Sequence, residues 1–156
     1  MSRPTEQTVP SWRLMLWRWF WRLTLVVSLA YAWYCFYVPP NDIAWANDIP
    51  AAQRQAAQTD RPLLMFFTGE WCVPCRIMKR TVFADEQVAA RVNSKFIPVM
   101  IHVERPAAAT ALRHYQVAAW PTTIITDPQG SVLHRVQGGM SKTDFLALLS
   151  EPLPTE

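Results

Sequence analysis

Hydrophobic and polar positions divide the 156-residue chain into two unlike parts. The first contains a run of twenty residues, WFWRLTLVVSLAYAWYCFYV (19–38), in which Arg22 is the only charged side chain. Twenty helical residues extend about 30 Å, which matches the hydrocarbon thickness of a bilayer. The pattern predicts a transmembrane signal-anchor helix over residues 19–38, preceded by an N-terminal tail over residues 1–18.

After residue 38 the apolar positions fall into shorter segments separated by turn-forming residues. Paired prolines begin a predicted linker over residues 39–48. Strand-like composition and length mark residues 62–67, 95–103, 121–126 and 131–137. Helical patterns mark residues 49–58, 76–83, 85–92, 106–115 and 143–149. This order predicts an α/β domain over residues 49–150, with a mixed central sheet, helices on both faces and a C-terminal tail over residues 151–156.

Two turn-forming features refine this prediction. The sequence DPQG at 127–130 places proline at the second position of a turn, so residues 121–137 should form a β-hairpin. Pro98 lies inside a strand-like segment but has no N–H for a sheet ladder. We therefore expect the strand that contains Pro98 to lie at an edge of the sheet.

Charge is concentrated before residue 39. Four arginines precede that point against one glutamate, whereas eleven basic and eleven acidic side chains follow it. The pI of about 9.0 thus reflects the tail and indicates no nucleic-acid surface. The positive-inside rule predicts a cytoplasmic N-terminus and an extracytoplasmic, periplasmic domain. Small residues in AWA (44–46) leave an alternative open, in which a signal is cleaved after Ala46 and a soluble periplasmic domain is released.

The cysteines supply the candidate chemistry. Cys35 lies in the apolar run and is interpreted as an apolar filler, which leaves Cys72 and Cys75 in TGEWCVPCRIMKR (68–80). A thiol at the mouth of a helix lies near unsatisfied backbone donors, which favour its thiolate. Cys72 is therefore the expected nucleophile, and Cys75, one turn later, the expected resolving thiol. Pro74 fits the first turn and stiffens the loop.

Three segments resemble the thioredoxin family in order and spacing. They are EWCVPC after an apolar strand, AWPTTII about forty-five residues later, and GGMSKTDFLALL near the end. Residues 69–99 are more closely similar to thioredoxin-like domains of bacterial envelope proteins, including the C-terminal domain of transmembrane thiol:disulfide interchange proteins. The resemblance covers residues 48–150. It implies a thioredoxin fold, a redox-active Cys72–Cys75 disulfide with no other cofactor, a shielding Trp71 and a cis Pro121.

The resemblance also implies a substrate-binding region formed by Trp71, Pro74, Trp120 and Pro121. Two positions depart from the family. Thioredoxins usually carry a buried acid six residues before the first cysteine, where this chain has Phe66, so Glu70 becomes a candidate for proton transfer by proximity in sequence alone. Trp120 is much bulkier than the residue that usually precedes the cis proline, which points to altered substrate choice.

These features predict an exported, membrane-tethered thiol-disulfide oxidoreductase that reduces or exchanges disulfides in envelope proteins. The Val–Pro pair between the cysteines lacks the histidine of strongly oxidising relatives, which favours reduction. The expected partners are proteins with thiols or disulfides, the membrane, and a separate membrane electron donor.

Two other functions stay open. A copper or other metal carrier could use the same thiolates with a histidine, but His102, His114 and His134 do not lie at ligand spacing from the cysteines, so no metal site is predicted. A non-catalytic binding module with a structural disulfide is the other alternative.

Overall fold

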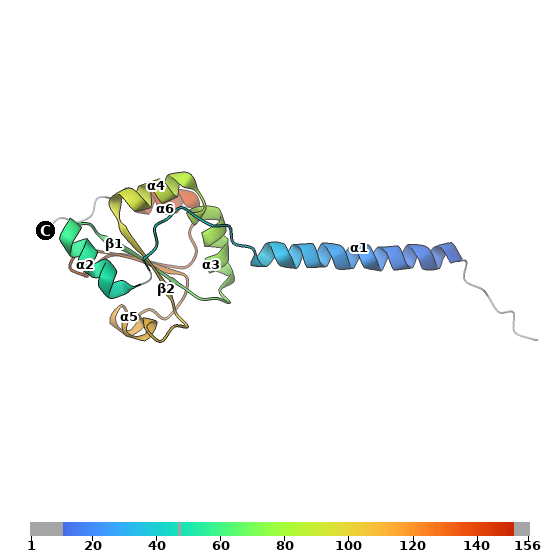
Figure 1. The fold of residues 1–156 in the computed structure, drawn as a ribbon, viewed down its shortest axis with the longest axis horizontal. Helices are drawn as coiled ribbons and strands as arrows, with labels where there is room; N and C mark the ends of the chain where they lie inside the picture. Colours follow the sequence, from blue (N-terminus) through green and yellow to red (C-terminus); the bar gives the residue numbers. More distant parts are fainter. Residues whose placement is uncertain (1–10, 47, 152–156) are drawn as a thin grey trace, which may run out of the picture. The chain divides into compact units, whose positions relative to one another are not determined.

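The computed structural model describes residues 11–46 and 48–151, and the chain divides into two compact units, Met1–Tyr37 and Val38–Glu156. In the first unit, helix α1 (Ser11–Phe36) runs for 26 residues (Figure 1). The prediction of a membrane-spanning helix over residues 19–38 is wrong. Among the described residues, no helix combines the length and the apolarity that crossing a membrane requires.

The error has a physical cause in the composition of α1. Its apolar residues include many tryptophans and tyrosines, whose rings carry a polar N–H or O–H group, and Arg22 lies among them. Length and scarcity of charge alone therefore overstated the apolarity of this segment. The predicted cytoplasmic N-terminus and extracytoplasmic domain rested on this single-pass span, so that prediction fails with it. Residues 1–10 of the predicted tail and most of residues 151–156 lie outside the described residues.

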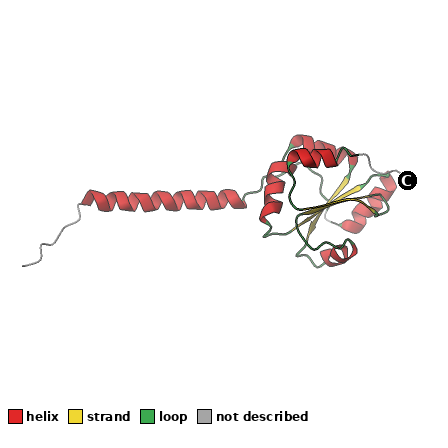
Figure 2. Ribbon diagram, turned by 180° about the vertical axis from the view of Figure 1, so that it is seen from behind, coloured by secondary structure: helices red, strands yellow, loops and turns green. Residues whose placement is uncertain are grey.

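The second unit contains the predicted mixed sheet. Its strands are β1 (Leu63–Thr68), β2 (Ile97–His102), β3 (Thr122–Thr126) and β4 (Val132–Gln137), in the order β2-β1-β3-β4. Strand β1 runs parallel to β2 and antiparallel to β3, and β3 and β4 form the predicted antiparallel hairpin. Figure 2 shows helices on both sides of these strands.

Two groups of helices cover the two faces of the sheet (Figure 1). Helices α2 (Ile49–Thr59) and α5 (Ala108–His114) pack on one face. The other face carries α3 (Val73–Met78), a π-helical segment η1 (Lys79–Phe83), α4 (Glu86–Lys95) and α6 (Lys142–Leu148). The sheet lies between the two layers, so strand β1 is buried along its whole length.

Side-chain alternation along β1 explains the two hydrophobic cores. Leu64 and Phe66 pack with the layer that contains α3, whereas Leu63, Met65 and Phe67 pack with the α2 layer. The run PLLMFF therefore has no polar alternation because both of its faces are covered. Its carboxyl end leads directly into the cysteine motif.

The edge position predicted for Pro98 is confirmed, since β2 is the outer strand next to β1. Among the residues that the structure describes, the outer side of β2 carries an isolated parallel bridge between Ala46 and Val99. The N–H of Ala46 donates to the Pro98 carbonyl at 2.9 Å, and the N–H of Met100 donates to the Ala46 carbonyl at 3.3 Å. A fifth strand is thus reduced to one residue, and Pro98 needs no N–H on that side.

Candidate active site

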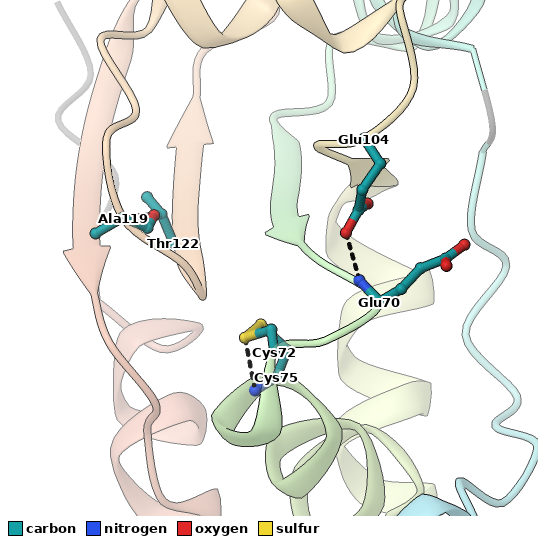
Figure 3. Close-up of a disulfide and its surroundings, with 6 residues drawn as sticks. All are labelled: Glu70, Cys72, Cys75, Glu104, Ala119 and Thr122. Atoms are coloured by element: carbon teal, nitrogen blue, oxygen red, sulfur yellow. Dashed lines mark hydrogen bonds between the residues drawn. A yellow bond between two sulfur atoms is a disulfide. The ribbon is translucent and has the colours of Figure 1, made fainter.

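The two cysteines of the motif form a disulfide at the start of α3 (Figure 3). Their Cα atoms lie 5.2 Å apart. Cys72 is the N-cap of α3, and its sulfur accepts a hydrogen bond from the Cys75 N–H at 3.2 Å. Pro74 occupies the first turn, where no helical partner for its missing N–H is needed. The helix start therefore presents backbone donors to the sulfur of Cys72, as a stabilised thiolate requires.

The two cysteine residues differ slightly in exposure. Cys75 is fully buried in the core that includes Phe66, whereas Cys72 keeps 7% of its surface exposed. An incoming thiol or disulfide therefore meets Cys72 first. This asymmetry fits the roles expected from the sequence, with Cys72 as the attacking and Cys75 as the resolving group.

Large apolar side chains are exposed beside the disulfide in sequence and on the cis proline loop. Trp71 is 80% exposed, Val73 54%, Ile77 47% and Trp120 46%. Most of the Trp71 ring is thus open to solvent in this oxidised form. Sequence analysis did not identify Val73 and Ile77 as site residues, although their spacing of four places them on one helical face beside the cysteines.

The loop before β3 carries the remaining candidate residues. The Trp120–Pro121 peptide bond is cis, as expected. Two hydrogen bonds hold the loop: Thr122 Oγ1 donates to the Ala119 carbonyl at 2.7 Å, and the Gly138 N–H donates to the Pro121 carbonyl at 2.8 Å. Figure 3 shows Ala119 and Thr122 on the segment across from the disulfide.

The turn after β4 lies close to both Pro74 and Pro121. The Gly138 hydrogen bond reaches Pro121, and a Cβ atom on Gly139 would lie 4.0 Å from Pro74 Cβ. The structure therefore brings the turn of Gly138 and Gly139 against both prolines. Gly138 has φ +97°, a conformation that glycine adopts without strain.

Phe66 fills the position at which the family resemblance predicts a buried acid. Its ring is fully buried and contacts Phe83 edge to face at a centroid separation of 4.7 Å. On the neighbouring strand its register partner is Met100. The sheet beneath the disulfide is thus hydrocarbon where a carboxyl group was expected.

Glu70, the candidate for proton transfer, is held through its backbone. Its N–H donates to Glu104 Oε1 at 2.5 Å. In Figure 3 the Glu70 side chain extends away from the disulfide toward solvent. This arrangement favours Glu70 as a fixed point of the loop rather than as a proton carrier.

Charged groups gather near the carboxyl end of β2. The hydrogen bond from the Glu70 N–H lowers the pKa of Glu104, with smaller effects from His102 and Lys79. Burial lowers the pKa of Lys79, and the charge of Glu104 opposes this effect. Burial likewise lowers the pKa of His102, aided by the charges of Lys79 and Arg105.

In the parts of the chain that the structure describes, no group of three or more His, Cys, Asp or Glu side chains is placed to hold a metal ion. His102 belongs to the charged group near β2. His134 lies on strand β4, and its Nδ1 atom is 3.6 Å from Glu151 Oε2. His114 packs edge to face on Tyr115.

Comparison with known proteins supports the same chemistry. The chain is 31% identical over 111 residues to the thiol:disulfide interchange protein DsbD of Ralstonia nicotianae. The alignment covers 70% of this chain and 18% of that protein. The chain thus spans about a fifth of the length of the curated relatives it matches.

Solved structures give the same fold. A putative disulphide-isomerase from Bacteroides thetaiotaomicron aligns with a TM-score of 0.63 and 26% identity, covering 72% of this chain and 93% of that one. The C-terminal domain of Neisseria meningitidis DsbD in its reduced form aligns with a TM-score of 0.58 and 21% identity, covering 65% of this chain and 91% of that one.

The family profile described as a thioredoxin-like domain matches residues 49–151. It includes the sheet, the Cys72–Cys75 pair and the cis proline loop. The chain therefore belongs to the thioredoxin-like family, with the fold and the Cys-x-x-Cys pair of a disulfide oxidoreductase.

Proposed function

We propose that this protein reduces or exchanges disulfides in other proteins, with Cys72 as the nucleophile and Cys75 as the resolving thiol. The observation that carries the proposal is the position of Cys72 as the N-cap of α3, where its sulfur accepts the Cys75 N–H, together with the complete burial of Cys75. The names of the relatives, which include thiol:disulfide interchange proteins, support the same class of reaction.

The reaction starts from the reduced pair. The Cys72 thiolate attacks one sulfur of a substrate disulfide, so that a mixed disulfide forms and the other substrate sulfur leaves as a thiolate. Cys75 then loses its proton and attacks Cys72, which releases the second substrate thiol. Two electrons pass to the substrate, and the Cys72–Cys75 disulfide seen in the structure is the product. Because Phe66 supplies no carboxyl group, the Cys75 proton passes to water.

Substrate contact is assigned to the exposed apolar side chains and the cis proline loop. Trp71 and Trp120 offer broad, exposed rings. Pro74 is exposed in the first turn of α3, and the buried Pro121 sets the course of the cis proline loop. An extended substrate segment could pair with the backbone before Pro121, as strand addition does elsewhere. The bulk of Trp120 narrows the choice of substrate relative to family members with a small residue there.

We assign the reducing direction on the basis of the Val–Pro pair between the cysteines. Neither side chain carries a hydrogen-bond donor that would stabilise a thiolate as a histidine would, so we expect no unusual stability of the reduced form. Each cycle then needs two electrons from a separate dithiol protein, because every turnover converts the Cys72–Cys75 dithiol into the disulfide, which must be reduced again. We expect that donor to be another thiol-disulfide exchange protein.

Turnover of insulin disulfides tests the function. The parent protein should reduce insulin with dithiothreitol as donor, and the Cys72→Ser variant should lose the activity. Cys35→Ser is the matched control, since Cys35 lies in the other unit and should leave turnover unchanged. If Cys72→Ser keeps the parent rate, the proposal fails.

The reduction potential tests the direction. Equilibration with glutathione buffers should give a value below about −200 mV, in the range of reducing thioredoxins. A value near −120 mV, typical of strong oxidants, would reverse the assigned direction but not the class of reaction.

A further inference from the structure

We propose that Glu104 is a positioning residue that fixes both the loop leading to Cys72 and the side chain of Trp120. Glu104 lies in the segment that follows β2, 29 residues after Cys75. The inference rests on the proposed function, because it concerns the site that would exchange disulfides. Its test is designed so that either proposal can fail alone.

The first contact is to the backbone beside the motif. Glu104 Oε1 accepts the N–H of Glu70 at 2.5 Å, across 34 residues of sequence (Figure 3). The strand ends are already joined one step earlier, where the Val103 N–H donates to the Thr68 carbonyl at 3.0 Å. Glu104 therefore extends the pairing of β1 and β2 by one more link. That link falls two residues before Cys72.

The second contact is at Gly69, which both Glu104 and Trp120 approach. A Cβ atom at Gly69 would lie 3.0 Å from Glu104 Oε1, 3.5 Å from Trp120 Nε1 and 3.6 Å from Trp120 Cδ1. The carboxylate and the indole ring thus approach the same face of a buried glycine. Segments after β1, after β2 and before β3 meet at this point, and the absence of a side chain on Gly69 makes the approach possible.

The same loop also determines where Cys72 lies. The Cys72 N–H donates to the Gly69 carbonyl at 3.3 Å, so a shift of Gly69 moves the nucleophile directly. Disulfide exchange requires the attacking sulfur to be aligned with the bond it breaks, and small misplacements reduce rates strongly. Glu104 would thereby act on the Cys72 sulfur through Gly69, the residue that the Trp120 ring also approaches.

The ionised form of Glu104 suits this role. The carboxylate is solvent-exposed, so apolar packing does not account for its placement. Its pKa is lowered chiefly by the Glu70 N–H, which means that the hydrogen bond is made to the charged group. Hydrogen bonds to an ionised acceptor are stronger than neutral ones.

Three variants separate the hydrogen bond from the charge. Glu104→Ala removes both, and its kcat/KM for insulin reduction should fall about tenfold, partly through a higher KM. Glu104→Gln keeps an acceptor oxygen and should stay within about threefold of the parent. Glu70→Ala removes a neighbouring carboxylate but keeps the backbone N–H, so it is the matched control and should match the parent.

A second measurement does not depend on turnover. The hydrogen-exchange protection factor of the residue-70 amide should fall about tenfold in Glu104→Ala and stay near the parent value in Glu104→Gln and Glu70→Ala. The inference is overturned if Glu104→Ala changes neither the protection factor of the residue-70 amide nor kcat/KM. It is also overturned if Glu104→Gln lowers both quantities as much as Glu104→Ala does. If the parent itself reduces no insulin, the proposed function fails, and the protection factors still decide whether Glu104 fixes the loop.

Discussion

The ring of Phe66 meets the ring of Phe83 edge to face, with their centroids 4.7 Å apart. Trp45 packs on the same two rings, and Phe145 contacts Phe83 from α6. This aromatic group shares one core with Cys75. The resolving cysteine therefore lies over hydrocarbon, at a place where the resemblance to thioredoxins predicts a carboxyl group.

Replacing Phe66 with aspartate should cost much of the domain's stability. Phe66→Asp removes a buried ring and buries a carboxyl group, so the free energy of unfolding should fall by roughly 4 kcal/mol or more at pH 7. Burial raises the pKa of the new carboxyl group in the folded state above its unfolded value. The loss should therefore shrink between pH 7 and pH 5, as measured by urea unfolding.

The control for this change is Phe66→Leu, which keeps the site apolar. It should cost about 1 kcal/mol, with no dependence on pH in the same range. An aspartate variant as stable as the parent at pH 7 would show that the site is hydrated, contrary to the packing described above.

An ion pair joins the start of α6 to the start of α4. Lys142 Nζ lies 2.6 Å from Asp85 Oδ2, and this hydrogen bond is the main cause that lowers the pKa of Asp85. A folded-state pKa below the unfolded value stabilises the fold above the unfolded pKa, and that contribution is lost as the pH falls through the folded pKa. Asp85→Asn should therefore lower the urea midpoint at pH 7, and its difference from the parent should begin to shrink as the pH falls below about 4.

Coupling between the two residues can be measured separately. In a Lys142→Met background, Asp85→Asn should lower the urea midpoint less than it does in the parent. Equal losses in the two backgrounds would mean that capping of α4 by Asp85, through the Gln87 and Val88 N–H groups, accounts for the whole effect.

Gly130 closes the turn between β3 and β4 with φ +100°. Its N–H donates to the Asp127 carbonyl at 3.1 Å, and an added Cβ would meet only ordinary contacts, the nearest at 3.8 Å. Gly130→Ala should therefore cost about 1 kcal/mol through backbone strain alone. Thermal unfolding measures both this variant and its control, Gly139→Ala. Gly139 does not have a left-handed φ, so Gly139→Ala should change the free energy of unfolding by less than about 0.5 kcal/mol. If Gly130→Ala is as stable as the parent, the turn has changed its backbone conformation to accommodate alanine, and the predicted strain is absent.

Much of the domain could be predicted from local sequence. The apolar run before the motif, the DPQG turn and Pro98 each impose a backbone constraint that acts over a few residues, and all three predictions are confirmed. The nature of α1 was mispredicted, because length and low charge were weighed without the polarity of its aromatic rings. The sequence also predicted a continuous helix over residues 76–83, whereas α3 changes to the π-helical η1 at Lys79.

The contacts of the site that were missed are long-range. Nothing near Glu104 in the sequence indicates that its carboxylate reaches the Glu70 amide, since strand pairing brings the two segments together. Gly69 likewise gives no local signal, because the atoms that need its space belong to Glu104 and Trp120. Only the register of β1 against β2 and β3 makes these contacts predictable.

The most direct test of the central claim is to identify which sulfur holds a trapped substrate. Cys75→Ser protein, reduced and then mixed with an oxidised protein substrate, should accumulate a mixed disulfide that mass spectrometry assigns to Cys72. Cys72→Ser protein, treated in the same way, should accumulate little, because Cys75 is fully buried. Equal trapping on Cys75, or no trapping in either variant, would contradict the account.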